Sequence, residues 1–162
     1  MPNYRRNRVP GGTYFFTVTL ADRRSHALTD HVEALREAVR RVQQARPLRI
    51  DAWVVLPDHL HAIWTLPEGD ADYSSRWREI KKAFTRAVGG SAWQRGFWEH
   101  TLRDERDYTA HVDYVHINPL KHGLVERVRD WPYSSFHRAV AQGVYPADWA
   151  GDGVGDIAAG DP

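Results

Sequence analysis

Residues 52–66 read Ala52-Trp53-Val54-Val55-Leu56-Pro57-Asp58-His59-Leu60-His61-Ala62-Ile63-Trp64-Thr65-Leu66. Two apolar stretches flank the pair Pro57-Asp58, a combination typical of a tight turn. The pattern therefore predicts two neighbouring strands, at residues 49–56 and 59–66. Side chains two positions apart on a strand share a face, so we expect His59 and His61 to point the same way and to be able to bind one cation together.

The segments on either side of this hairpin complete an α+β pattern. Apolar alternation predicts a further strand before it, and a helical period predicts one helix on each side. The expected elements are a strand at 13–20, a helix from Thr29 or Asp30 to just before Pro47, a helix at 74–88 and a short strand at 96–100. Strand, helix, strand, strand, helix, strand is the ferredoxin-like order, which forms an antiparallel sheet. A small helix is expected around 134–141, in a C-terminal extension.

The pattern of residues 104–118 predicts an added helix with one apolar stripe and one polar stripe of side chains. The apolar stripe should face the core; it contains Tyr108, Val112 and Val115. The polar stripe has spacings of four, three and four, at which side chains are neighbours on a helix; it contains Asp107, His111, Tyr114 and Asn118. Pro119 disfavours helical geometry at the residue before it, so we predict that the helix ends at Asn118. This helix should bring Tyr114 towards the sheet.

Each of these features has an ordinary explanation when it stands alone. With nine histidines in 162 residues, chance gives about half of one His-x-His pair. A single tyrosine on a helix is more often a packing or surface residue. Two imidazoles, a carboxamide and a phenol together, however, make up a metal site beside a nucleophile. That combination points to cleavage of a phosphodiester through a covalent phosphotyrosine.

Composition sets wide bounds on the class of protein. The length fits one domain at 1–150, followed by a tail at 151–162 that is rich in Gly, Asp and Ala and expected to be disordered. The absence of cysteine excludes a disulfide framework, a cysteine-ligated metal and a thiol nucleophile. We expect no membrane segment, because the apolar stretches are too short, and no secretory signal. A cytoplasmic location fits these features.

The formal net charge is only +1, but basic residues are concentrated in two segments. A basic stripe with interleaved aromatic residues is a typical nucleic-acid footprint, although it can also be a solvated helix face. In the helix at 74–88, Trp77, Ile80 and Phe84 should face inward. The side chains expected to bind nucleic-acid phosphates are Arg5, Arg6 and Arg8 near the N-terminus, and Arg78, Lys81, Lys82 and Arg86 on this helix.

The sequence resembles the single-tyrosine transposases, in which two histidines flank a hydrophobic residue. His59-Leu60-His61 matches that motif, and residues 114–125 look like the signature of the REP-associated branch. Further similarity lies at Tyr4-Arg5-Arg6, 11–19, 97–100, 131–137 and 145–149, so the resemblance spans about residues 4 to 149. Carried over residue by residue, it makes His59 and His61 metal ligands, Tyr114 the nucleophile and Asn118 the third protein ligand. Other single-tyrosine transposases have Gln at the last position, and Asn offers the same carbonyl oxygen.

The resemblance implies a metal-dependent enzyme that cuts and rejoins single-stranded DNA folded into REP-type hairpins. Tyr114 would form a 5′-phosphotyrosine and leave a free 3′-OH, with Mg²⁺ or Mn²⁺ as cofactor. A phenol is almost fully protonated at neutral pH, since its unperturbed pKa is about 10. His111 and His116 are both candidates to assist its deprotonation, and the face of Tyr114 favours His111.

Two other functions compete with this interpretation. One is a catalytically silent nucleic-acid-binding module, which needs the basic stripes but not Tyr114. The other is a metal-dependent nuclease that activates water and forms no covalent adduct. The expected partner is single-stranded or hairpin DNA in the bacterial cytoplasm, at the nucleoid, and the chain could be a monomer or a homodimer.

Overall fold

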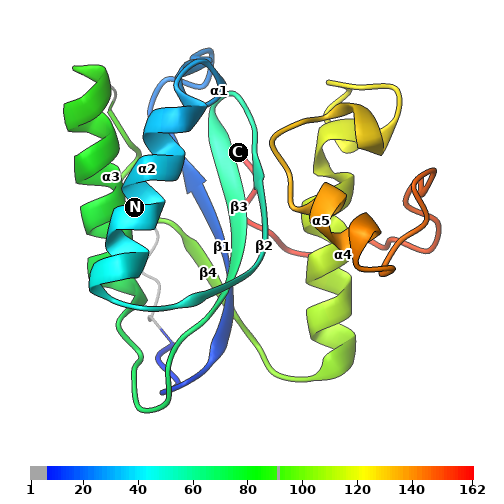
Figure 1. Cartoon of the computed structure of the whole chain (residues 1–162), viewed down its shortest axis with the longest axis horizontal. Helices are drawn as coiled ribbons and strands as arrows, with labels where there is room; N and C mark the ends of the chain where they lie inside the picture. Colours follow the sequence, from blue (N-terminus) through cyan, green and yellow to red (C-terminus); the bar gives the residue numbers. More distant parts are fainter. Residues whose placement is uncertain (1–6, 91) are drawn as a thin grey trace.

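The computed structural model describes residues 7–90 and 92–162. Four antiparallel strands form one sheet in the order β2-β3-β1-β4, with helices on both faces (Figure 1). The elements are β1 (Thr13–Thr19), α1 (Ala27–Asp30), α2 (Val32–Ala45), β2 (Arg49–Val55), β3 (His59–Thr65), α3 (Tyr73–Val88), β4 (Trp98–Leu102), α4 (Glu105–Lys121), the short 3₁₀ helix η1 (Val128–Asp130) and α5 (Phe136–Ala141). The predicted α+β class and ferredoxin-like order are confirmed.

Helices α2 and α3 cover one face of the sheet and bury the main apolar core. Alternate residues of β1 and the residue that follows it point into this core: Tyr14, Phe16 and Val18, and then Leu20. From α3, the indole of Trp77 stacks on Trp64 of β3 with 4.2 Å between ring centroids. The α3 helix begins at Asp72, whose side chain accepts a hydrogen bond from the Ser75 amide, and ends at Gly89 in the left-handed conformation. The inward stripe predicted for this helix is confirmed.

The opposite face of the sheet is covered by α4. Its apolar contacts come from Phe15, Val54 and Ile63 on the strands and from Val115 on the helix. The alternation that sends Leu60 and Ala62 to the main core turns His59 and His61 towards α4. Thr17 pairs in register with His61, so polar side chains share this face with a smaller apolar cluster.

The end of α4 differs from the prediction. The helix runs through Pro119 to Lys121 instead of stopping at Asn118, so that boundary was wrong. Proline is tolerated here because it lies in the last turn, where few backbone hydrogen bonds remain to be lost. The amide of Gly123, which has a φ of +70°, then bonds the Leu120 carbonyl at 3.0 Å and closes the helix. Strand β4 also lies two residues later than predicted.

The C-terminal extension forms backbone hydrogen bonds with the outer edge of β2. The Ser135 amide donates to the Trp53 carbonyl and the Val55 amide donates to the Tyr133 carbonyl, both at 2.9 Å. A buried network fastens the extension to α4: His116 bonds the Ser135 hydroxyl at 2.8 Å and the Tyr145 hydroxyl at 3.1 Å. The extension therefore occupies an edge that an added strand would otherwise use.

Residues 151–162 form no helix or strand, and their last part runs back to the sheet. Ala159 is 4% exposed and its carbonyl accepts a hydrogen bond from the Thr17 hydroxyl. The boundary at residue 150 and the disorder of the tail stay predictions. Within the described residues, no helix is long and apolar enough to cross a membrane.

Candidate active site

Helix α4 and strand β3 bring together the residues that the sequence placed in two distant motifs. Tyr114 and Asn118, four residues apart on α4, face the histidine side of β3 and are buried there. The rings of His61 and Tyr114 lie edge to face, with 5.5 Å between centroids. The Asn118 carboxamide is close enough to His61 to influence its pKa. The four residues predicted to form a metal site and its nucleophile thus line one small volume.

The hydrogen bonds of the two histidines fix which nitrogen is available. His59 Nδ1 donates to Asp58 Oδ1 at 2.8 Å. The Thr17 hydroxyl gives its proton to the Ala159 carbonyl, so His61 Nδ1, 2.8 Å away, must donate to Thr17 Oγ1. Both rings therefore direct an unprotonated Nε2 into the site, the arrangement usual for metal-binding histidines.

Three ligand atoms face the site without a hydrogen-bond partner in the described part of the chain. They are Nε2 of His59, Nε2 of His61 and Oδ1 of Asn118, and all three are buried. The Asn118 amide nitrogen donates to the Tyr114 carbonyl at 3.4 Å, which leaves the carboxamide oxygen turned inward. Buried polar atoms are rarely left unpaired unless something else binds them. The donor set therefore fits a divalent cation.

Burial keeps both imidazoles in the neutral form that binds metals. It lowers the pKa of His59 to about 4, assisted by repulsion from His61 and opposed by Asp58. Burial likewise lowers the pKa of His61, against the opposing effect of Asp161. Neutral imidazole is thus the expected state at physiological pH.

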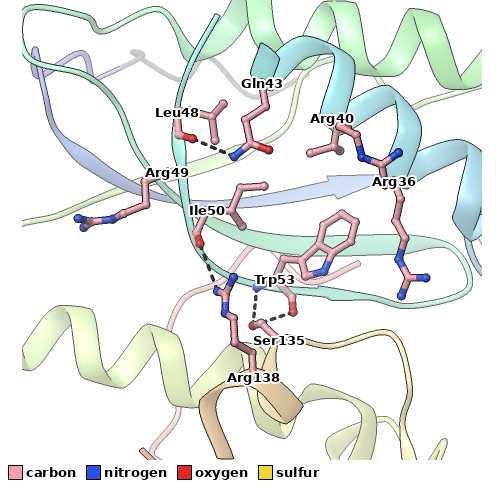
Figure 2. A pocket seen from close by; sticks show the side chains of 10 residues that line it. Arg36, Arg40, Gln43, Leu48, Arg49, Ile50, Trp53, Ser135 and Arg138 are labelled. Carbon is pink, nitrogen blue, oxygen red and sulfur yellow. Dashed lines mark hydrogen bonds between the residues drawn. The ribbon is translucent and has the colours of Figure 1, made fainter. Parts of the chain in front are cut away.

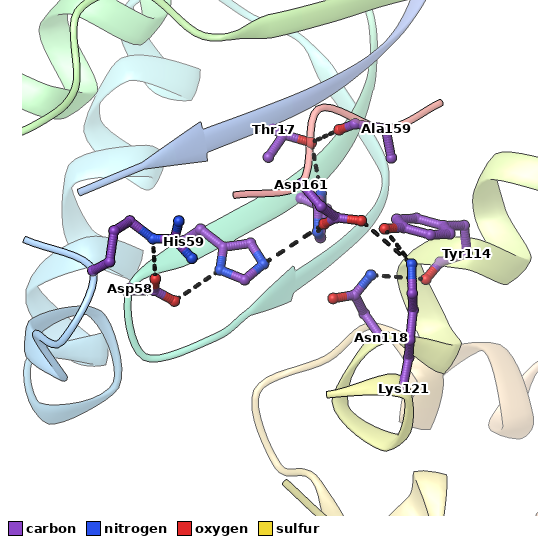
Figure 3. A network of polar contacts seen from close by, with 10 residues as sticks. Thr17, Asp58, His59, Tyr114, Asn118, Lys121, Ala159 and Asp161 are labelled. Carbon is purple, nitrogen blue, oxygen red and sulfur yellow. Dashed lines mark hydrogen bonds and ion pairs between the residues drawn. The ribbon is translucent and has the colours of Figure 1, made fainter. Parts of the chain in front are cut away.

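The site contains two further residues, Lys121 and Asp161, that the sequence patterns did not predict (Figure 3). Lys121 Nζ lies 3.1 Å from the Tyr114 phenol oxygen and 4.5 Å from the centre of its ring. Asp161, from the end of the chain, places Oδ1 3.1 Å from His61 Nε2 and Oδ2 3.4 Å from Lys121 Nζ. Lys121 had a usable signal, because it follows Tyr114 by two helical turns. Asp161 had none, since it lies in a segment without periodic pattern.

The contact between Asp161 and His61 is informative about what the site binds. A nitrogen lone pair and a carboxylate oxygen that face each other at 3.1 Å repel unless a proton or a cation lies between them. His59, His61 and Asp161 form one of two groups of potential ligands in the described residues. The geometry therefore favours a positive charge at this point.

The second group surrounds His111, the residue predicted to assist Tyr114. His111 Nδ1 donates to the Asp107 carbonyl at 2.8 Å, and its buried Nε2 has no hydrogen-bond partner among the described residues. Its ring stacks on His100 with 4.7 Å between centroids, and His100 bonds Asp107 at 2.9 Å. The hydrogen bond shown at the Tyr114 phenol comes from Lys121, whereas His116 bonds the C-terminal extension. The roles of His111 and His116 stay predictions.

The basic residues that were predicted to bind DNA on α3 lie away from this site (Figure 1). Arg5 and Arg6 lie outside the described residues, and Arg8 is exposed. On α3, Lys81 donates to the carbonyls of Gln94 and Gly96, at 3.3 and 2.8 Å. Its exposed neighbours on the helix are Arg78, Lys82 and Arg86. Because α3 and α4 cover opposite faces of the sheet, these side chains and Tyr114 are on different sides of the molecule.

Comparison with known proteins gives a consistent set of relatives. No family model matches the chain. The REP-associated tyrosine transposase of Escherichia coli K12 is 59% identical over 162 residues, covering 99% of this chain and 98% of that protein. A Haemophilus influenzae Rd protein assigned to the same family is 43% identical, covering 94% of this chain and 95% of its own. A solved structure of a REP-associated tyrosine transposase bound to a REP hairpin, 59% identical in sequence, superimposes with a TM-score of 0.96 and covers all of this chain and 98% of its own.

Proposed function

Because the chain belongs to the REP-associated tyrosine transposases, we propose that it cuts and rejoins single-stranded DNA at REP-type hairpins through a phosphotyrosine on Tyr114. The nearly full-length similarity to a relative solved with a REP hairpin supports hairpin DNA as the substrate. The buried phenol beside orphaned ligand atoms supports the covalent route.

Tyr114 is the nucleophile in this proposal. Its oxygen attacks the scissile phosphorus, the Tyr114 O–P bond forms, and the bond from phosphorus to the 3′ oxygen breaks to leave a 3′-OH. His111, three residues earlier on α4, is our candidate to receive the phenol proton, because its Nε2 is an unprotonated base without a hydrogen-bond partner in residues 7–90 and 92–162. A free 3′-OH can later attack the phosphotyrosine, which rejoins the strand without an external energy source.

Lys121 holds the reacting oxygen in place. Its ammonium group donates to the phenol oxygen at 3.1 Å, so the oxygen presents its other lone pair to an incoming phosphate. The same positive charge lies where negative charge develops on the phosphoryl oxygens during attack. Lys121 therefore positions the nucleophile and stabilises the charge it creates.

A divalent cation, Mg²⁺ or Mn²⁺, would be held by Nε2 of His59, Nε2 of His61 and Oδ1 of Asn118. When bound there, it would polarise the scissile phosphate. Asp58 and Thr17 keep the two imidazoles oriented through their Nδ1 atoms. Nitrogen donors together with a carbonyl oxygen suit Mn²⁺ better than Mg²⁺.

Asp161 occupies the space that the substrate needs. A scissile phosphate must lie beside the Tyr114 oxygen, the Lys121 ammonium group and His61, and the Asp161 carboxylate is already next to two of these three. Two negative groups cannot share that position at low cost. The end of the chain must therefore move when DNA binds.

The observation that carries the proposal is the phenol of Tyr114 beside three buried ligand atoms that have no hydrogen-bond partner among the described residues. The test incubates the protein with a labelled hairpin oligonucleotide and Mn²⁺ and resolves the products on a denaturing gel. A covalent protein–DNA adduct that EDTA prevents supports the proposal. Cleavage without any adduct points to water activation, and binding without cleavage points to a silent DNA-binding module.

A further inference from the structure

A groove runs along the outer edge of β2, between α2 and α5, apart from the Tyr114 site (Figure 2). Its volume is about 620 Å³. Among the described residues, the lining contains four arginines and no acidic residue, although the whole chain has nearly equal numbers of basic and acidic residues. The arginines are Arg36 and Arg40 on α2, Arg49 at the start of β2, and Arg138 on α5.

Three of the four guanidinium groups have only weak partners, whereas Arg49 is held by both oxygens of the Asp51 carboxylate at 3.1 Å. Arg36 pairs with Glu33 at 2.5 Å and Arg40 pairs with Glu37, each within one turn of α2 and on the exposed surface. Such pairs contribute little free energy, so the arginines can turn to a stronger partner. Arg138 donates to two backbone carbonyls of β2, at 3.3 Å each. A phosphate, which guanidinium binds in a bidentate manner, is such a partner.

An indole forms part of the same groove. Trp53 points between Arg36 and Ser135 and is partly exposed. One side of the indole packs against the main apolar core, and the remainder is accessible from the groove. Unpaired bases stack on aromatic faces with little regard to sequence. Guanidinium groups beside a partly exposed indole are a combination that can bind a single nucleic-acid strand.

We propose that this groove holds an unpaired DNA strand, with phosphates on Arg36, Arg40 and Arg138 and a base against Trp53. The inference rests on the proposed function, because it takes the unpaired DNA next to the hairpin as the occupant. The groove is joined to the catalytic helix through Ser135, which bonds both Trp53 and His116 of α4. It would give the enzyme a second DNA contact outside the Tyr114 site.

The test measures binding by fluorescence anisotropy in the Tyr114→Phe background, with a DNA hairpin that has or lacks a single-stranded flank. The variant is Arg36→Gln with Arg40→Gln. The charge-matched control is Arg127→Gln with Arg129→Gln, two exposed arginines outside the groove. Circular dichroism melting shows whether each variant folds.

We expect the groove variant to bind the flanked hairpin about tenfold more weakly at low salt, and to reduce the slope of log affinity against log salt by about 1.4. Binding of the unflanked hairpin and the behaviour of the control should change much less. Trp53→Leu should weaken flanked binding without changing the salt slope. Equal losses in the groove and control variants, equal losses with and without the flank, or no loss at all would overturn the proposal. A loss seen with the corresponding RNA but not with DNA would overturn it as well.

The result of this binding test can be distinguished from the result of the adduct test of the proposed function. Adduct formation by the parent, together with unchanged flank binding by the groove variant, rejects the groove and leaves the transposase mechanism standing. Flank-specific loss without an adduct from the parent supports the groove and rejects the mechanism.

Discussion

The two faces of the sheet are made from the same strands but differ in content. The face under α2 and α3 is an apolar core, to which β3 contributes Leu60, Ala62 and Trp64. The face under α4 receives His59 and His61 from the same strand, and both are buried. Because successive side chains of a strand point to opposite faces, β3 contributes apolar packing to one face and the candidate metal ligands to the other. Under the proposed function, a bound cation would satisfy the buried polar atoms of the second face.

Replacing Tyr114 should have the largest effect. Tyr114→Phe removes one buried oxygen that bonds Lys121, so the fold should survive while cleavage and adduct formation are lost. The matched control is Tyr108→Phe on the same helix, whose hydroxyl donates to Asp51 at 2.8 Å. That variant should still form the adduct on a denaturing gel. An adduct from Tyr114→Phe would disprove the covalent role of this residue.

Adjacent residues of β3 allow a direct contrast between the faces. His61→Ala should lower cleavage by at least about a hundredfold and weaken Mn²⁺ binding. Leu60→Ala should lower the free energy of unfolding by about 2–5 kcal/mol and leave Mn²⁺ affinity unchanged. Isothermal titration calorimetry with Mn²⁺ and urea unfolding measure the two effects. If His61→Ala keeps its metal affinity and its activity in EDTA, these histidines are structural.

We expect acid to lower the free energy of unfolding through His116, a buried histidine of α4. Burial lowers the pKa of His116 to about 4, below its ordinary value of 6.5. Between these two pH values the unfolded chain binds a proton that the folded chain does not, so stability is present above pH 6.5 and is lost as the pH falls towards 4. The loss from His116 alone is on the order of 3 kcal/mol.

Urea unfolding at several pH values tests this contribution. His116→Gln keeps a polar side chain near Ser135 but cannot titrate, so its stability should depend less on pH than that of the parent. Parallel curves for the parent and His116→Gln would contradict the prediction.

A smaller effect is expected from the end of the chain. Asp161→Ala removes the carboxylate that competes with the scissile phosphate beside His61 and Lys121, so cleavage should become several-fold faster. Asp156→Ala, five residues earlier and exposed, is the control. Initial rates of adduct formation measure both. A slower Asp161→Ala enzyme would instead make Asp161 a metal ligand.

The smallest effect concerns the basic side of α3. Lys82→Gln with Arg86→Gln should reduce the salt slope of DNA binding by about 1.4, the value for two phosphates of a single strand. Cleavage at saturating DNA should stay unchanged, because these residues lie on the face opposite Tyr114. Anisotropy titrations at increasing salt give the slope. An unaltered slope would make this stripe a solvated helix face.

Local patterns predicted most of the fold. The Pro57-Asp58 turn between two apolar stretches gave the central hairpin, and the stop at Gly89 was correct. The end of α4 was missed, because the rule against helical geometry before proline weakens in the last turn. The pairing of residues 133–135 with the edge of β2 could not be predicted, since it joins segments far apart in the chain.

The sequence by itself determined the chemistry available: two imidazoles on one strand face, and a phenol and a carboxamide one helical turn apart. These follow from periodicities of two and 3.6, which depend only on neighbouring residues. Only the tertiary structure decided that Lys121 contacts the phenol and that Asp161 enters the site from the far end of the chain. It also gathered arginines from α2, β2 and α5 into one groove. Contacts of this kind depend on how elements pack, which no local pattern encodes.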